Sequence, residues 1–396
     1  MARLRRHLIF CLAVCVLFNV AAQSDTVIAA TDTAKTVSDL QQIKPRRTIF
    51  QKLMDYISDS NRKKPTKKFD FSILGGPYYS QDTNFGIGLV AAGTYRRNLA
   101  DTVAPPTQFS LYGDVSITGY YKVGVDGSSY FRGDRIWLYY DVYFYSRPDR
   151  YWGIGYDNNV NDDNMVKYKR WKARLHAAAL FRVFNPNLYV GPVLQLDYVD
   201  AKTQPDPQLW RRQKRRTFTD AVGIGIVYDT RDDVYNAYRG IYARIEQLFA
   251  PRFIGNQYDF ILTEGDFRWY KQLWKGGVLA SQLHARLTFG NTPWGEMSEL
   301  GGSNSMRGYW EGRYNDKCAA DFTVELRQHL FQRFGLVAWG GVGEVFPRVN
   351  DMFKGHALWN AGIGLRWEFK HRVNVRVDYG FGQDQRGFVF SINEAF

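Results

Sequence analysis

Regular alternation of polar and apolar residues is the feature that most constrains how this chain can fold. It begins at Phe69, reaches Phe396 and is clearest in residues 137–145 and 388–396. Successive side chains of a β-strand point to opposite faces, so this period of two predicts strands with one apolar and one polar face. Aromatic residues make up 16% of the chain, which fits such strands.

The alternating segments are long and even in number, which is typical of a closed membrane barrel. Most reach the ~9–11 residues that a tilted membrane strand needs. Sheet edges cannot stay open in lipid, so the first strand must pair with the last. We therefore expect an all-β protein, a closed antiparallel transmembrane β-barrel of about sixteen strands over residues 69–396. The expected strands are residues 70–79, 84–96, 108–118, 120–131, 134–146, 166–183, 187–200, 217–229, 239–250, 258–272, 277–290, 319–331, 335–346, 357–370, 372–382 and 386–396.

A soluble β-sandwich is the alternative fold, and three features argue against it. The strands are long, aromatic residues crowd the strand ends as in membrane girdles, and the sequence finishes on an alternating segment. Phe388, Phe390, Ile392 and Phe396 resemble the β-signal that the outer-membrane insertion machinery recognises. Glu394 departs from that pattern at a position that is normally apolar.

The lengths of the connections give an independent indication of orientation. The longest are residues 147–165, 201–216 and 291–318, and each follows an odd-numbered strand of the expected series. Joins after even-numbered strands are short, with the exception of residues 97–107. Outer-membrane barrels have long extracellular loops and short periplasmic turns. We therefore expect the three long loops on the cell surface and both chain ends in the periplasm.

The first 22 residues are expected to be a secretory signal peptide. A basic start precedes an apolar stretch from Leu8 to Val20, and the small residues Ala21 and Ala22 follow it. A membrane anchor is the alternative, but the apolar stretch is shorter than the ~20 residues of a spanning helix. Two of the three cysteines would leave with this segment, so Cys318 would have no partner for an intrachain disulfide.

Residues 23–68 are expected to form a periplasmic tail with one short helix. Thr48 and Gln51 have capping-box spacing, and apolar residues form a stripe between Ile49 and Ile57. This pattern predicts an amphipathic helix at 48–58, which lies on the inner leaflet or packs against a partner. A plain linker is the alternative, and the basic clusters on both sides of the stripe favour the helix.

The net charge of +13 also bears on the partners. Export favours anionic lipid headgroups or surface glycolipid over nucleic acid. The densest basic cluster lies in the loop at 201–216, where a solvated surface is favoured over contact with anionic glycolipid. The histidines are scattered, without a Ser-His-Asp order, an HExxH motif or paired-cysteine spacing. We therefore expect no enzyme activity, no catalytic residue, no cofactor and no metal site.

The loop at 291–318 has a composition unlike the rest of the chain. Its central part, 300–317, combines several glycines with Tyr309, Trp310 and Tyr314. Disordered segments favour Ser, Lys, Glu and Pro, so these residues indicate an ordered loop.

Met306-Arg307-Gly308-Tyr309 in this loop resembles the motif of the BamA/TamA superfamily, also called the bacterial surface antigen family. Gly301-Gly302 and Gly312-Arg313-Tyr314 fit the same pattern. Further similarities are Tyr151 to Gly155 in the third loop, and Tyr228 to Asp232 followed by Arg239-Gly240 at the eighth turn. The resemblance implies an outer-membrane barrel with the loop at 291–318 folded into its lumen.

The resemblance also implies that Arg307 lies in the lumen against a carboxylate. Glu325 stands where the family supplies one. A second carboxylate is usual on the thirteenth strand, but Gly341 occupies that position here. We expect either a looser loop or a substitute contact with Glu344. The alternative is that Arg307 simply solvates a surface loop.

For function, the resemblance implies assistance with insertion or transport of protein or lipid at the outer membrane. Relatives that insert or secrete proteins carry periplasmic POTRA domains, and residues 23–68 offer no room for one. We therefore expect a short family member whose partners are outer-membrane lipids and periplasmic proteins. Gly75, Gly76 and Pro77 would weaken pairing at the end of the first strand. A passive channel or a surface antigen that keeps only the fold is the alternative function.

Overall fold

The computed structural model describes residues 69–95, 107–131, 134–202, 209–370 and 372–396. The expected signal peptide at 1–22, the tail at 23–68 and its helix at 48–58 lie outside the described residues.

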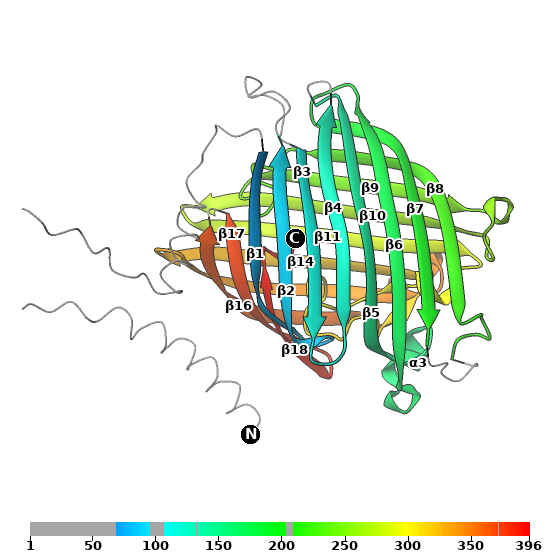
Figure 1. Ribbon diagram of the computed structural model, residues 1–396. Helices are drawn as coiled ribbons and strands as arrows, with labels where there is room; N and C mark the ends of the chain where they lie inside the picture. The colour runs from blue at the N-terminus through cyan, green and yellow to red at the C-terminus, as the bar shows by residue number, and fades with distance from the viewer. Residues whose placement is uncertain (1–68, 96–106, 132–133, 203–208, 371) are drawn as a thin grey trace, which may run out of the picture. The chain divides into compact units, whose positions relative to one another are not determined.

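Sixteen strands among the described residues close into one antiparallel barrel, in which β1 neighbours both β2 and β18 (Figure 1). This confirms the predicted fold and strand number. Short 3-10 turns, one short helix and a two-stranded sheet lie in the connections. The barrel strands are β1 Phe69–Ser80, β2 Asn84–Tyr95, β3 Thr107–Ser116, β4 Tyr121–Phe131, β5 Ile136–Tyr151, β6 Val166–Arg182, β7 Leu188–Ala201, β8 Arg216–Asp229, β9 Gly240–Ala250, β10 Phe260–Trp274, β11 Gly277–Gly290, β14 Cys318–Phe331, β15 Phe334–Phe346, β16 Leu358–Lys370, β17 Val373–Gly382 and β18 Gln385–Ile392. The connections hold α3 Tyr156–Val160, η2 Asp162–Asn164, η3 Arg252–Ile254, η4 Trp294–Glu296, β12 Ser298–Glu299, β13 Asn315–Asp316 and η5 Val349–Asp351.

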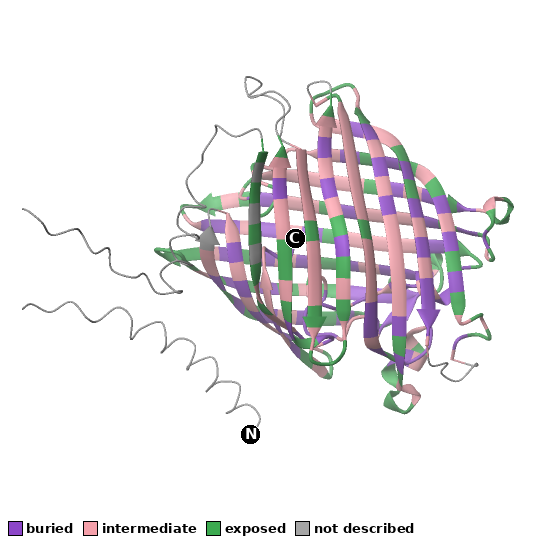
Figure 2. Cartoon of the chain, in the orientation of Figure 1, coloured by how far each residue is buried: buried purple, intermediate pink, exposed green. Residues whose placement is uncertain are grey.

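Alternating burial along the strands separates an outer from an inner face, as the banded strands of Figure 2 show. In β8, Phe218 and Val222 are each 45% exposed, whereas Thr217 and Thr219 are buried. Apolar side chains that face outward from a membrane barrel contact lipid. The period of two in the sequence therefore corresponds to a lipid face and a lumen face.

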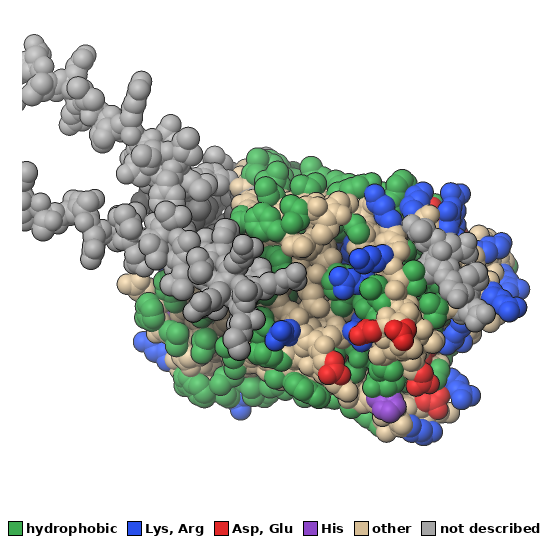
Figure 3. Space-filling view, turned by 90° about the horizontal axis from the view of Figure 1, so that it is seen from below, with side chains coloured by type: hydrophobic (Ala, Val, Ile, Leu, Met, Phe, Trp, Pro, Cys, Tyr) green, Lys and Arg blue, Asp and Glu red, His purple; other side chains and the backbone are tan. Residues whose placement is uncertain are grey.

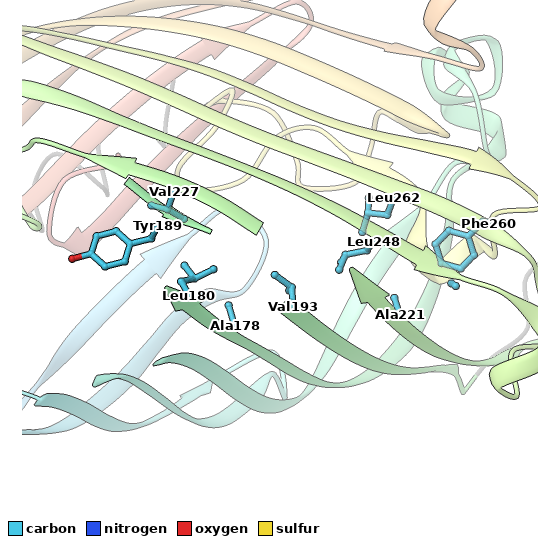
Figure 4. Packing of buried hydrophobic residues seen from close by; sticks show 10 residues of the cluster. Ala178, Leu180, Tyr189, Val193, Ala221, Val227, Leu248, Phe260 and Leu262 are labelled. Atoms are coloured by element: carbon cyan, nitrogen blue, oxygen red, sulfur yellow. The ribbon is translucent and has the colours of Figure 1, made fainter. Parts of the chain in front are cut away.

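An apolar cluster covers part of the inner face of β6 to β10 (Figure 4). Such side chains stiffen the wall without placing charge in the lumen. The cluster contains Ala178, Leu180, Tyr189, Val193, Ala221, Val227, Leu248, Ala250, Phe260 and Leu262. In the part of the chain that the structure describes, no helix is long and apolar enough to cross a membrane.

β18 is shorter than predicted. It ends at Ile392, and the expected strand over 386–396 is wrong for its last four residues. Those residues turn toward the lumen, where arginine side chains donate hydrogen bonds to them. Glu394 accepts a hydrogen bond from Arg366 Nε at 2.8 Å, and the Phe396 carbonyl accepts one from Arg327 Nη2 at 3.0 Å. Phe396 is therefore buried, and only Phe388, Phe390 and Ile392 of the expected β-signal lie in the strand.

β5 is longer than predicted, extending to Tyr151. Its additional residues pair with β6, from Arg147 with Arg170 to Tyr151 with Val166. The connection between β5 and β6 therefore starts at residue 152.

Candidate functional site

The loop between β11 and β14, residues 291–317, is an ordered hairpin inside the barrel. β12 and β13 pair Ser298 with Asp316 at its base. Beyond that pair, Leu300 N donates to Tyr314 O at 2.9 Å, and Gly302 N donates to the Tyr309 carbonyl at 3.1 Å. We call this segment the lumen loop.

The tip of the lumen loop lies against β17 through two glycines. Gly308 has a φ of +113°, a conformation that side chains with a Cβ rarely adopt. Opposite it, a Cβ added to Gly380 would lie 2.3 Å from the Arg307 carbonyl oxygen. Backbone therefore approaches backbone directly, and neither position has room for a larger residue.

Arg307 is 1% exposed and has three partners from three different strands. Its Nη1 donates to Asp378 Oδ2 on β17 at 2.7 Å, and its Nη2 donates to Glu325 Oε1 on β14. Its guanidinium carbon lies 3.7 Å from the centre of the Trp339 ring on β15. Charged hydrogen bonds and ring stacking are both suited to a planar guanidinium, so this contact fixes the loop tip.

Glu344 is not a partner of Arg307, which corrects the substitute contact expected from the sequence. Its two carboxylate oxygens accept the backbone N–H groups of Phe353 and Gly355, both at 3.0 Å. Glu344 therefore holds the connection between β15 and β16. The second carboxylate is Asp378, which the sequence analysis missed. An inward-facing acid on a membrane strand was the signal that could have found it.

Tyr309 and Met306 complete the contacts of the tip. The Tyr309 hydroxyl donates to the Trp359 carbonyl at 2.7 Å and accepts the backbone N–H of Gln383 at 2.7 Å. Burial raises the pKa of the Tyr309 hydroxyl to about 12, so it stays protonated and remains a donor. Met306 is 1% exposed and packs in an apolar cluster with Leu300.

The contacts of Arg307 belong to a larger buried network. Asp378 also accepts from Arg366 at 2.5 Å and from Arg376 at 3.3 Å. Glu325 accepts from Arg327 Nε at 2.9 Å. Each carboxylate therefore keeps another arginine when Arg307 is removed.

A second set of ion pairs holds the base of the lumen loop. Arg170 donates to Glu299 at 2.6 Å, and Arg147 donates to Glu311 at 2.5 Å. The Glu311 backbone N–H donates to Asp82 Oδ1 at 2.9 Å. Burial and the nearby Glu311 charge raise the pKa of the Asp82 carboxyl to about 7. Although burial opposes it, Arg170 lowers the pKa of Glu299 to about 2.

The seam between β1 and β18 is the weakest junction of the described barrel. β1 pairs with β2 from Phe69–Tyr95 to Ser80–Asn84, but its register with β18 contains the single pair Tyr79–Phe390. Pro77 in β1 has no backbone N–H to donate to a ladder. A lumen cavity of about 1030 Å³ reaches this seam and is lined there by residues of both strands.

The motif from Tyr228 to Gly240 forms a turn that is held by the opposite wall. Arg372, which follows β16, donates to the Asn236 carbonyl at 2.7 Å and to Asp232 Oδ2 at 3.0 Å. Its guanidinium carbon lies 3.7 Å from the centre of the Tyr238 ring. Tyr235 of the same turn lines the lumen cavity. This turn therefore covers part of the lumen at the end opposite the long loops.

Histidines contribute to the lumen network. His176 Nε2 lies 3.0 Å from Glu246 Oε2, and His284 Nδ1 lies 3.2 Å from Asp321 Oδ1. Within the described ranges, no group of His, Cys, Asp and Glu is arranged to hold a metal ion.

Comparison with known proteins gives consistent matches. The model of the Omp85 superfamily domain matches residues 108–396. BamA from Haemophilus ducreyi lacking POTRA domains 1–3 aligns with 82% of this chain and 70% of its own, at 14% identity and a TM-score of 0.53. CdiB from Acinetobacter baumannii aligns with 83% of this chain and 60% of its own, at 14% identity and a TM-score of 0.53. CdiB from Escherichia coli aligns with 87% of this chain and 70% of its own, at 12% identity and a TM-score of 0.55. No curated protein matches by sequence.

At these identities the solved structures support the fold, whereas the family model covers most of the chain. The protein is a bacterial outer-membrane barrel, which confirms the predicted location. Its relatives are barrels of the assembly or translocation type. The chain belongs to the Omp85 superfamily.

Proposed function

We propose that this protein assists insertion or translocation of a protein or lipid at the outer membrane through the β1–β18 seam. The observation that carries the proposal is the seam's single register pair, Tyr79–Phe390. Other neighbouring strands pair over most of their length, so separating β1 from β18 breaks the fewest ladder hydrogen bonds. A strand or acyl chain that enters there would meet both lipid and the lumen cavity.

The lumen loop acts in this proposal as a brace beside the seam. Arg307, Glu325 and Asp378 join the loop to β14 and β17, so the barrel wall keeps its shape when β1 moves away. Gly387 of β18 faces the tip, because a Cβ there would lie 3.4 Å from the Gly308 Cα. Movement of β18 would therefore change the contacts of the Met306–Tyr309 motif. No enzymatic step is part of the proposal.

The proposed partners are outer-membrane lipids and periplasmic proteins. The tail at 23–68 is the segment proposed to recruit a periplasmic partner. Co-purification of periplasmic proteins with the wild type and with a 43–60 deletion tests this part. Equal recovery from both forms would contradict it.

A disulfide across the seam tests the proposed opening. Directly opposed residues of antiparallel strands have Cα atoms ~4.5–5.5 Å apart, within the ~4.4–6.8 Å that a disulfide spans. Tyr79→Cys/Phe390→Cys, in a Cys318→Ser background, should close the seam when oxidised. Cells depleted of the native protein should then show altered outer-membrane protein or lipid composition, and a reductant should restore it.

Val377→Cys/Phe390→Cys is the matched control, because Val377 is the partner of Phe390 within the β17–β18 ladder. This disulfide joins strands that are already paired and leaves the seam free. A seam-locked protein that maintains outer-membrane composition as well as the control would overturn the proposal.

A passive channel is the second candidate, and the polar cavity wall favours it. Asp114, Lys122 and Asp126 line the cavity of about 1030 Å³. Steady, solute-selective conductance in planar bilayers that is unaffected by Arg307→Ala would support this function. Conductance that depends on Arg307 would favour a mobile lumen loop instead.

A further inference from the structure

The outer face of β6, β7 and β8 combines a basic cluster with an apolar groove. The connections after β5, β7 and β11 leave the same end of the barrel, because antiparallel strands alternate in direction. Long loops mark the extracellular end. Figure 3 views this end, and Lys and Arg side chains gather along one side of it.

Three basic side chains converge on a single carboxylate at this rim. Asp200 Oδ2 lies 3.0 Å from Lys202 Nζ and 3.2 Å from Arg216 Nε, and its Oδ1 lies 3.2 Å from Arg215 Nε. One negative charge against three positive charges leaves a local surplus of two. Asp200 is buried, whereas the side chains of Lys202, Arg215 and Arg216 are 33%, 36% and 59% exposed. The carboxylate positions the cations, and their surplus charge faces outward.

The strand register places an aromatic and apolar region directly beneath these cations. Trp171 stands opposite Asp200, and Lys202 Nζ lies 3.8 Å from the centre of the Trp171 ring. Two residues further from the rim on each strand, the row consists of Ala173, Tyr198 and Phe218. A step of two residues in a strand is about 7 Å, so the two rows are within reach of one amphipathic molecule.

A groove of about 470 Å³ runs through this lower row. Ala173 is flanked by Phe144 on β5 and Tyr198 on β7, so the small side chain leaves a depression between two rings. The groove volume falls within the ~300–1,000 Å³ of ligand pockets. The wall is almost entirely apolar and consists of Val123, Gly124, Val125, Val142, Tyr143, Phe144, Ala173, Arg174, Leu175, Leu196, Tyr198 and Phe218.

We propose that this surface binds a phosphorylated, acylated glycolipid of the outer leaflet. The exposed cations of Lys202, Arg215 and Arg216 would hold headgroup phosphate, and an acyl chain would lie in the groove beside Ala173. Basic side chains at a membrane surface attract anionic headgroups, and guanidinium groups match phosphate oxygens. The position at the extracellular rim selects the outer-leaflet glycolipid over the phospholipids of the inner leaflet. The site lies on the outside of the barrel and does not involve the lumen loop or the seam.

Two variants test the headgroup contact and the acyl contact separately. The first replaces Asp200 by Asn and Lys202, Arg215 and Arg216 by Gln, so that no buried carboxylate loses its partners. We expect roughly 100-fold weaker glycolipid binding, because each basic residue at the surface adds affinity. The second, Ala173→Trp, fills the groove without a change of charge and should weaken binding about tenfold through lost chain burial.

Matched controls place the same changes elsewhere on the barrel. Gln substitutions at Arg252, Arg348 and Lys354 remove three cations from other connections at the same end, and Ala361→Trp enlarges an alanine of β16. Binding of purified glycolipid to the reconstituted full chain is measured by native mass spectrometry. Dephosphorylated glycolipid, phosphatidylglycerol and inorganic phosphate are the comparison ligands. Gel mobility before and after heating verifies that each variant is folded.

Loss of glycolipid binding in both test variants, with the controls at wild-type affinity, would support the site. Equal binding by test variants and controls would overturn it. Phosphatidylglycerol binding as tight as that of the glycolipid would overturn the assignment to glycolipid. The readout is binding by purified protein, so a negative result leaves the proposed function at the seam untouched, and a seam failure leaves this site untouched.

Discussion

Arg307→Ala should release the lumen loop while the barrel stays folded. Arg307 makes two charged hydrogen bonds and one ring contact, and breaking a buried ion pair costs about 3–5 kcal/mol. Asp378 keeps Arg366, and Glu325 keeps Arg327, so the lower end of this range applies. A change of about 3 kcal/mol corresponds to a roughly 100-fold increase in the population of released loops.

Cysteine labelling measures that population. The Ser305 hydroxyl is buried next to the tip, so a Ser305→Cys side chain reacts with a maleimide only when the loop leaves its site. In a Cys318→Ser background, Arg307→Ala should raise the labelling rate roughly 100-fold.

Arg313→Ala is the matched control for Arg307→Ala, because Arg313 lies in the same loop. Its ion-pair partner Asp162 has a side chain that is 78% exposed. A pair with one solvent-exposed partner contributes about 0–1 kcal/mol, and the contacts of Arg313 with the Asn159 carbonyl and the Trp152 ring do not involve the loop tip. Labelling should therefore change less than roughly fivefold. Labelling of Arg307→Ala at the wild-type rate would refute the idea that this arginine locks the loop.

Gly380→Ala should displace the tip and accelerate labelling, because its Cβ would meet the Arg307 carbonyl, whereas Gly76→Ala has open space and should not. Glu344→Gln should leave labelling unchanged and increase protease cleavage within residues 347–357, whose backbone it holds. Asp82 is neutral in the folded protein up to a pKa of about 7 and ionised in the unfolded chain above about 4, so its stabilising contribution should decline as pH rises from about 4 to 7. The thermal stability of Asp82→Asn should lack that decline. Arg372→Ala should free the turn at 230–239 and increase bilayer conductance, and an unchanged conductance would contradict its role as a cover.

Local sequence properties determined most of the fold. Alternation is a property of each strand by itself, so the number of strands, their order and their approximate bounds followed from it. The errors in the predicted strands were confined to the strand ends. β5 gained Arg147 to Tyr151 through pairing with β6, and β18 lost its last four residues to lumen partners. No local pattern distinguishes a strand end from a residue that turns inward.

The contacts within the lumen were only partly accessible from the sequence. The resemblance placed Arg307 in the lumen and named Glu325, and the structure brings these two side chains together. It did not identify Asp378 on β17 and offered Glu344 on β15 instead, because both are acidic residues on strands and periodicity alone does not show which one reaches the loop tip. Asp378 is 71 positions from Arg307 along the chain, and only closure of the barrel brings it to the loop tip.

The sequence by itself determined a barrel with a glycine-rich loop and a basic surface connection, because side-chain periodicity and composition are local. The tertiary structure decided which strands share the partners of Arg307, how little of β1 pairs with β18, and that Lys202, Arg215 and Arg216 stand above Ala173. These are matters of register and closure. The shear of a closed barrel is set by all of its strands together, and no single segment of the chain contains it.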